Sequence, residues 1–384
     1  MKIQGNLVNV SLTLALILSL VLASTAGAQE SEEQAEETEK EEEKDPNRGR
    51  FLALPFIITE PAIGEGIGGG LIYFHEKPDD PIKRKVTSGK NIAATGKHGK
   101  PPPTATGLFA MYTNTETYAY GLGHSGSSPT DKYRYIGAAA AMNINATVYL
   151  GDFPVKFNMD GRVLYLHGKR RWKDSNIFIG ASASYLDSTT KFKTDNPVIQ
   201  PLTPDFSATD VGVALSVIYD GRDDTMMPSS GQLYDLTVWN YGGALGGDFD
   251  YTTARFKFNM FHRLGEKFVL GYRFDFSTAS GDVPYYSEPY VSIRGIPALR
   301  YTGENVAVIE VEGRYDFAKR WSGVAFAGLG FVDETELSQS EDDIYGYGVG
   351  IRFQALKEQN IWLGVDLAQG PEDKAWYVQM GHAW

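Results

Sequence analysis

The 384-residue chain carries 36 Lys and Arg against 48 Asp and Glu, a formal net charge of −12. It therefore lacks the basic excess typical of nucleic-acid-binding proteins, and nucleic acid is not expected as a partner. The absence of cysteine excludes disulfide bonds and a cysteine-linked lipid anchor.

Residues 1–28 are typical of a secretory signal peptide. Lys2 precedes a short apolar run, Ser11 to Ala23, and Ala26-Gly27-Ala28 offers a small-residue cleavage site. The alternative is an uncleaved membrane anchor, but the run is short for a spanning helix and ends in small residues. We expect cleavage before Gln29. No later stretch of eighteen apolar residues predicts a helical span.

Residues 29–50 form an acidic leader. Within them, 29–46 carry ten acidic residues against Lys40 and Lys44, a net charge of −8, which is two thirds of the charge of the chain. The segment lacks aromatic residues and is predicted to be disordered, on the periplasmic side of an outer membrane. It is either a solubilising leader or a tether that meets a basic partner.

From residue 51 to 384 the apolar residues recur with a period of two and predict an all-β domain. Fifteen strands are clear. Bacterial single-chain barrels have even strand numbers, so we expect sixteen strands, with the hidden one inside 140–156. The clear strands are 66–76, 104–113, 116–124, 132–142, 155–167, 176–188, 208–220, 231–241, 251–263, 268–278, 304–317, 321–333, 343–355, 360–368 and 374–384.

Several strands alternate between an apolar face and a charged face. In 268–276, aromatic and aliphatic residues oppose Arg273 and Asp275, and in 307–317 they oppose acidic and basic residues in turn. A soluble sandwich would bury its apolar faces against a second sheet, whereas a membrane barrel turns them toward lipid and accepts charges inside. We therefore predict a transmembrane antiparallel β-barrel, with the sandwich as the alternative.

The last residues, 375–384, read as one alternating strand that ends on an aromatic residue. Trp376, Val378, Met380 and Trp384 would share the lipid-facing side. Such an ending is typical of the closing strand of a membrane barrel.

The connections differ in length. Short turns at 114–115 and 318–321 are expected on the periplasmic side, and long loops at 77–103 and 279–303 outside. The loop 77–103 has a net charge of +5, so it is either a contact for lipid phosphates or a solvated loop.

Two internal motifs indicate a family. Tyr219–Gly231 reads YDGRDDTMMPSSG and Ser292–Tyr301 reads SIRGIPALRY. Together with the last strand, they resemble the BamA/TamA (bacterial surface antigen) family of outer-membrane proteins, over about 51–384. The resemblance implies sixteen strands, with the first motif in a periplasmic turn between the eighth and ninth, and the second in a long outer loop after the eleventh. The turn residues are Asp220, Arg222, Asp223, Pro228 and Gly231.

The resemblance also implies that the long loop folds back into the lumen and is locked there by its arginine. A guanidinium in a confined pore needs carboxylate partners, and Glu310 and Glu312 lie on the inward face of the next strand. The family places a further acid in an F-x-D-x-G pattern, but this chain reads Phe326-Ala-Gly, and Asp333 is the candidate substitute. The alternative is an exposed loop arginine. The tip residues of the lock are Arg294, Gly295, Ile296 and Pro297.

In the family, weak pairing between the first and last strands opens a lateral seam. The glycine-rich segment 64–70 is interpreted as the first strand, and glycine weakens a strand by losing packing and backbone entropy. The alternative is that these glycines relieve crowding. The seam candidates are Gly66, Gly68, Gly70, Gly381 and Trp384.

The predicted function is that of a barrel-only relative without POTRA domains, acting in outer-membrane protein assembly or as a membrane scaffold. The alternative is a passive pore or transporter partly plugged by 279–303. The six histidines show no metal spacing and no nucleophile motif stands out, so no catalysis, cofactor or metal is expected. The expected location is the outer membrane of a Gram-negative bacterium, with both chain ends periplasmic. Expected partners are outer-membrane lipids and the assembly machinery for its own insertion, and protein clients are not identified.

Overall fold

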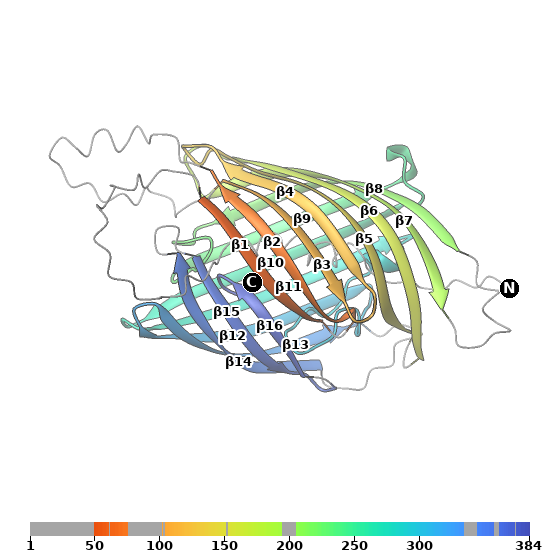
Figure 1. The fold of residues 1–384 in the computed structure, drawn as a ribbon. Helices are drawn as coiled ribbons and strands as arrows, with labels where there is room; N and C mark the ends of the chain where they lie inside the picture. Colours follow the sequence, from red (N-terminus) through yellow and green to blue (C-terminus); the bar gives the residue numbers. More distant parts are fainter. Residues whose placement is uncertain are drawn as a thin grey trace, which may run out of the picture.

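A computed structural model describes residues 50–60, 62–75, 102, 104–150, 153–193, 205–333, 344–356, 361–372 and 374–384. Sixteen antiparallel strands pair in chain order into one sheet that curls into a barrel (Figure 1), which confirms the predicted fold. The strands are β1 (Arg50–Glu60), β2 (Gly64–Phe74), β3 (Ala105–Thr113), β4 (Tyr118–Ser127), β5 (Tyr133–Leu150), β6 (Phe153–Arg171), β7 (Ile177–Lys193), β8 (Phe206–Asp220), β9 (Gly231–Tyr241), β10 (Tyr251–Leu264), β11 (Phe268–Gly281), β12 (Asn305–Ala318), β13 (Trp321–Val332), β14 (Ile344–Leu356), β15 (Ile361–Gln369) and β16 (Lys374–Met380).

In the described loops, single-turn 3-10 helices occur at η2 (Gly243–Leu245) and η3 (Tyr285–Ser287). Within the part of the chain that the structure describes, no helix is long and apolar enough to cross a bilayer. The predicted signal peptide and nearly all of the acidic leader lie outside the described residues.

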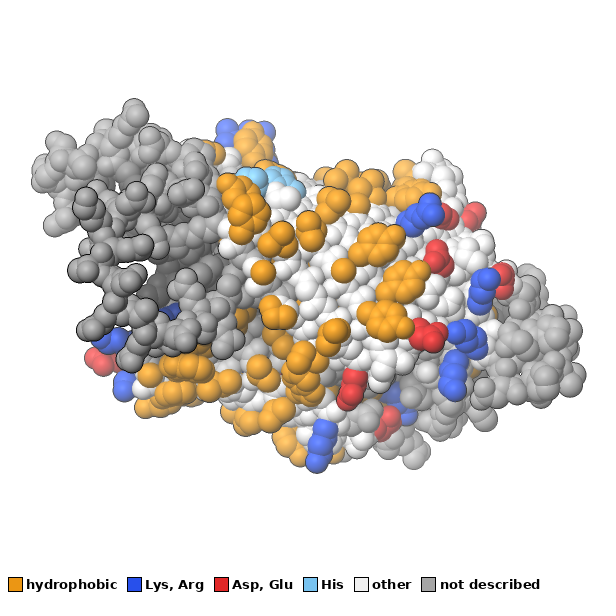
Figure 2. Space-filling view, in the orientation of Figure 1, with side chains coloured by type: hydrophobic (Ala, Val, Ile, Leu, Met, Phe, Trp, Pro, Cys, Tyr) orange, Lys and Arg blue, Asp and Glu red, His pale blue; other side chains and the backbone are white. Residues whose placement is uncertain are grey.

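Side chains alternate between the outer wall and the lumen as the sequence predicts. In β12, Ile309 and Val311 are exposed on the outside, whereas Glu310 and Glu312 are buried inside. Figure 2 shows apolar side chains spread across the outer wall, with charged side chains gathered toward one end. A bilayer would cover this apolar surface, which water would not tolerate at such an extent.

The sixteenth strand is β1, and the prediction that it lies inside 140–156 is wrong. Residues 140–156 instead belong to the long hairpin of β5 and β6. β1 reads FLALPFIITE, so both of its faces are apolar and period two is obscured. Phe56 and Ile58 point inward because an apolar cluster fills this part of the lumen.

The position of β1 also reverses the expected sides of the first connections. The short turn at 114–117 lies at the same end as the long segment 282–304, and His75 and Thr104 lie at the end that holds 220–231. The prediction that the turn 114–115 lies at the opposite end from the long loops is therefore wrong. The prediction that 77–103 lies at the same end as 279–303 is also wrong for the two ends of that segment. Most of 77–103 lies outside the described residues. We call the end with 220–231 the turn end and the end with 282–304 the loop end.

The loop between β11 and β12 folds into the barrel. Tyr285 and Tyr286 of η3 are fully buried in an apolar cluster with inward side chains of β1 and of β3 to β7, including Met142, Phe157 and Met159. The lumen at this end is therefore an apolar core rather than a uniformly polar channel. Burial of the apolar area of these side chains stabilises the inserted position of the loop, through the hydrophobic effect that also stabilises the core of a soluble protein.

The chain does not end inside a strand, in contrast to the prediction. β16 ends at Met380, and Gly381, at φ +71°, turns the last residues away from the sheet. Trp384 then packs on Phe261 of β10, at a ring-centroid distance of 6.1 Å. Trp384 therefore does not share the lipid-facing side of β16.

Candidate functional site

A ladder of alternating charges crosses the inner wall of β10, β11 and β12. Arg255 donates to Asp275 at 2.8 Å, and Asp275 also accepts from Arg273 at 3.0 Å. Arg273 continues to Glu310, at 2.5 Å. Asp275 therefore lies between two guanidiniums, which compensate the cost of burying its charge.

Arg294, at the tip of the inserted loop, extends this ladder. Its guanidinium lies 2.9 Å from Glu312 Oε2, 2.7 Å from Asp366 Oδ2 and 3.7 Å from Glu310 Oε1. It also lies over the ring of Phe326, 3.4 Å from the centroid. Burial would lower the pKa of Arg294, but the three carboxylates hold it above its usual value. The side chain is therefore charged.

Asp366 of β15 supplies the further carboxylate that this chain lacks on β13. It accepts from both Arg294 and the fully buried Arg352 of β14. Asp333, the candidate substitute, instead accepts from the backbone N–H of Asn305 at 3.0 Å and does not reach the arginine. The cluster Arg255, Arg273, Arg294, Arg352, Asp275, Glu310, Glu312 and Asp366, which we call the lumen lock, thus holds four positive and four negative charges.

The loop tip also contacts the last strands through its backbone. Gly295 has φ +96°, and a Cβ there would lie 2.8 Å from the backbone of Gln369 and Gly370, so only glycine fits. Its N–H donates to the hydroxyl of Tyr377 in β16 at 3.0 Å. Ile296 is buried with Val306 and Val308, and the Pro297 carbonyl accepts from the N–H of Arg300 at 3.3 Å. The tip therefore joins β12, β15 and β16.

The turn motif at the other end is held by its own carboxylates. Asp223 Oδ1 accepts three backbone N–H groups, including those of Ser229 and Ser230 at 2.9 and 3.1 Å. The Pro228 carbonyl accepts from Arg314 at 3.1 Å. Gly231 begins β9 where a Cβ would clash with the backbone of Gly221.

Asp220 accepts hydrogen bonds from guanidinium groups, in contrast to Asp223, which accepts them from the backbone. Asp220 bridges Arg222 at 2.9 Å and Arg134 of β5 at 3.0 Å. Arg134 continues to Asp131 at 2.7 Å, and Asp131 also pairs with Arg171 of β6. We call these five residues the turn clasp, because they join β5, β6 and β8 at the turn end.

The C-terminal tail docks on the same turn. The N–H of His382 donates to the Met226 carbonyl at 3.0 Å, and a Cβ at Gly381 would clash with that carbonyl oxygen. Burial and the positive charges of Arg222, Lys257, Arg314 and Arg352 hold the pKa of His382 well below its usual range. The docked tail therefore carries a neutral imidazole.

Acidification should release the tail. The pKa of His382 is lower when docked than when free, near 6.5, so the free form binds more protons and docking weakens as pH falls below about 6.5. We expect carboxypeptidase to remove the tail faster at pH 5 than at pH 8, relative to a His382→Gln control that does not titrate. Equal ratios at both pH values would contradict this prediction.

The two end strands form a seam. β1 pairs only with β2 and β16 only with β15, and no β-ladder joins β1 to β16 among the described residues, although the two lie side by side (Figure 1). Pro55 of β1 lacks an N–H, as is usual for edge strands. Since β16 has seven residues and β1 eleven, part of the β1 edge has no partner of matching length.

The segment 64–70 forms β2, so the prediction that it is the first strand is wrong. Gly66, Gly68 and Gly70 face the lumen, and a Cβ on Gly68 would clash with the ring of Phe56. At Gly68, close packing of a neighbouring aromatic ring explains the glycine. Of the seam candidates, Gly381 and Trp384 belong to the docked tail.

The structure thus brings Arg294, Glu310 and Glu312 into one cluster, and Asp220 and Arg222 into another. Sequence reasoning missed Asp366 and Arg352 of the lock, and Arg134, Asp131 and Arg171 of the clasp. Alternation already places Arg273, Asp275 and Arg352 on inner faces, but strand order and register are needed to pair them. Nothing in the sequence near Asp131 signals Arg171 as a partner 40 positions away.

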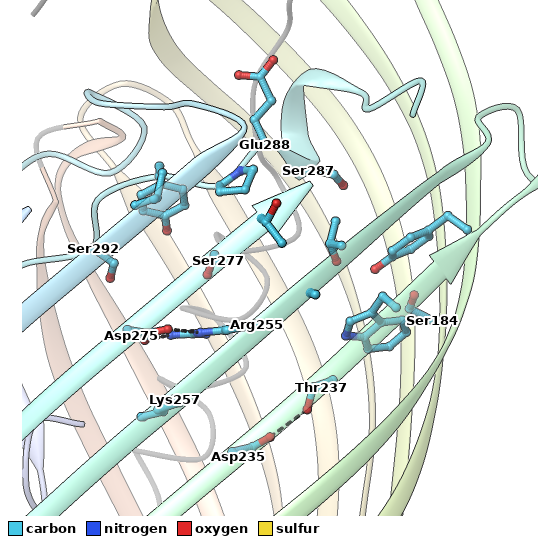
Figure 3. Close-up of a pocket in the computed structure, with 18 of the residues that line it drawn as sticks. Ser184, Asp235, Thr237, Arg255, Lys257, Asp275, Ser277, Ser287, Glu288 and Ser292 are labelled. Atoms are coloured by element: carbon cyan, nitrogen blue, oxygen red, sulfur yellow. Dashed lines mark hydrogen bonds and ion pairs between the residues drawn. The ribbon is translucent and has the colours of Figure 1, made fainter. Parts of the chain in front are cut away.

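Unfilled space remains beside the lock. A cavity of about 450 Å³ lies between the inner walls of β6 to β12 and the loop residues Ser287 to Ser292. Figure 3 shows Asp275, Arg255 and Lys257 on neighbouring strands, and Thr237 and Asp235 on the next strand, where they are the cross-strand partners of Arg255 and Lys257. The lumen is therefore narrowed but not completely filled. Within the described ranges, no group of three or more His, Asp or Glu side chains could hold a metal ion.

Comparisons with known proteins agree with this architecture. Residues 100–355 match the Omp85 superfamily domain. The crystal structure of BamA from Haemophilus ducreyi lacking POTRA domains 1–3 is similar over 97% of this chain and 78% of that one, at 12% identity and a TM-score of 0.55.

Two structures of CdiB are also similar. CdiB from Acinetobacter baumannii has 11% identity and a TM-score of 0.54, and covers 86% of this chain. CdiB from Escherichia coli has 9% identity and a TM-score of 0.56, and covers 88%. This chain spans 59% and 63% of those two proteins. At such identities the likeness shows the fold alone, and a comparison with curated proteins found no match.

Proposed function

Because the chain belongs to the Omp85 superfamily of outer-membrane barrels, we propose that it assists the insertion of other β-strand proteins into the outer membrane through its seam. The observation that carries this proposal is the β1 edge, which has no ladder to β16 among the described residues. An unpaired edge is a template on which an incoming strand can form hydrogen bonds.

The lumen lock supports this proposal. It joins the inserted loop to β15, and the neighbouring Gly295 N–H joins the loop tip to β16 through Tyr377. A barrel that opens at one edge needs its remaining wall held by contacts inside the lumen. We propose that the lumen lock and the turn clasp supply these contacts. We also propose that the turn end faces the periplasm, so that both chain ends lie there.

The test is a folding assay in proteoliposomes with a urea-unfolded outer-membrane barrel as client. We expect the chain to accelerate client folding over empty liposomes. Because the chain has no cysteine, the seam can be stapled with pairs that combine Ala53 or Ile57 of β1 with Trp376 or Val378 of β16. A cysteine pair that forms a disulfide bond across the seam should abolish the acceleration of client folding, and a reductant should restore it.

A matched staple controls for oxidation itself. Leu71 of β2 and Leu108 of β3 are exposed cross-strand partners away from the seam, so a Leu71→Cys, Leu108→Cys pair should leave the acceleration unchanged. No acceleration by the unmodified chain would contradict the proposal. If client folding were still accelerated when each seam disulfide had formed, the activity would not depend on the seam.

The second candidate is a passive pore, which the 450 Å³ lumen cavity favours. A pore would give a steady conductance in planar bilayers without any client. Little conductance in the intact chain, rising on deletion of 285–300, would indicate a plugged barrel and favour the assembly role.

A further inference from the structure

A polar relay lies on the outer wall of the barrel, where apolar side chains dominate. His75 Nε2 is 2.8 Å from Thr106 Oγ1, which is 2.7 Å from His124 Nδ1. His124 Nε2 is in turn 3.0 Å from the hydroxyl of Tyr135. Figure 2 shows the histidines together at the edge of the barrel, beside apolar side chains. Four hydrogen-bonding side chains on a lipid-facing wall need a polar ligand or a membrane interface.

Positive charge flanks the relay at the turn end. The ring of Tyr133 lies between Lys132 and Arg170, each cation 5.7 Å from its centroid. Both cations are exposed, and no carboxylate within the described ranges forms an ion pair with either. The nearby Asp131 is occupied inside the barrel by the turn clasp. Beside the Tyr133 ring, at the corner of the outer wall next to the relay, Lys132 and Arg170 therefore place two positive charges that have no ion-pair partner among the described residues.

A shallow hollow of about 550 Å³ continues from the relay across β4 to β7. Its outer floor is made of small residues, Gly137, Gly168 and Ala181, and exposed Leu166 forms a wall. A Cβ added at Gly168 would meet no atom within 4 Å. The hollow is thus open space on the outer wall, in which an acyl chain can lie.

We propose that this corner binds one anionic glycerophospholipid, with its phosphate at Lys132 and Arg170 and an acyl chain over Gly168. With His124 protonated on Nε2, Thr106 donates to Nδ1 and Nε2–H donates to Tyr135. The Tyr135 O–H is then left to donate to a phosphate or ester oxygen of the lipid. Charge complementarity selects an anionic head group, and the apolar hollow selects a diacyl lipid over free phosphate.

The test is native mass spectrometry of the full chain exchanged into equal amounts of phosphatidylglycerol, phosphatidylcholine and lipid A. We expect phosphatidylglycerol to be retained preferentially. Lys132→Gln and Arg170→Gln should each reduce that retention about fivefold, the effect of one cation near a lipid surface. Gly168→Leu should reduce retention of both phospholipids, because it fills the hollow.

Two control variants are matched by chemistry. Arg162 lies on the same face of β6 near the middle of the strand, and Gly323 is an outward glycine of β13 with no neighbour closer than 4.0 Å. Arg162→Gln and Gly323→Leu should leave retention unchanged, and heat-modifiable migration on gels should show that every variant is folded. Equal retention of both phospholipids, preference for lipid A, or equal losses in the controls would each overturn the proposal.

Discussion

Replacing Arg294 with methionine should destabilise the barrel by about 3–5 kcal/mol, the usual cost of removing one partner from a buried ion pair. Glu310 and Asp366 keep Arg273 and Arg352 as partners, but Glu312 loses its ion pair inside a closed lumen. Repulsion among these carboxylates should also release the loop tip. Denaturant unfolding of the folded barrel measures the loss of stability. Release of the loop tip should appear as a rise in planar-bilayer conductance.

The matched control is Arg300→Gln. Arg300 also lies in the inserted loop and pairs with Glu372 at 2.6 Å, but that carboxylate is 41% exposed. Water screens such a pair, so we expect a loss under about 1 kcal/mol. If Arg294→Met were as mild as this control, the lumen lock would not hold the loop in place.

The second large effect should follow Asp220→Asn, which keeps the size of the side chain and removes its charge. Arg222 then loses its carboxylate and Arg134 keeps only Asp131, so two guanidiniums at the turn end are left partly unpaired. We expect a loss of about 2–4 kcal/mol in the free energy of unfolding. The midpoint of denaturant unfolding, at an unchanged slope, measures it.

Lys191→Gln is the control for charge removal on a neighbouring strand. Lys191 pairs with Asp205 at 3.1 Å, but both side chains are more than half exposed, so its loss should change stability little. An Asp220→Asn variant that unfolds at the same midpoint as the unmodified chain would mean that the turn clasp contributes no net stability.

The two ends of the barrel use different physics. At the loop end, Tyr285 and Tyr286 bury apolar area against Phe157 and Met159, so the loop is held by packing as well as by charge. At the turn end, charged groups dominate: the clasp, Arg314 on the turn, and His382 of the tail among arginines. Acidification should therefore act on the turn end by protonating His382 of the tail.

The strand pattern of this barrel was readable because period-two alternation requires only local information. β10 to β14 show it clearly, since charged inner faces and aromatic outer faces differ strongly. β1 was missed for the opposite reason, because its inner face is also apolar and Pro55 interrupts it. That single omission reversed the expected sides of the first connections, because each strand changes the direction of the chain.

By itself, the sequence predicted the membrane barrel, because period-two alternation depends only on local information. The number of sixteen strands and the positions of the two motifs followed from the even strand number of such barrels and from the family resemblance. The tertiary structure decided the partners: Asp366 for Arg294, Arg134 for Asp220 and Met226 for the tail. These contacts join residues 72, 86 and 156 positions apart. Only strand order, register and the inserted loop bring such distant side chains within hydrogen-bond distance, and no local pattern carries that information.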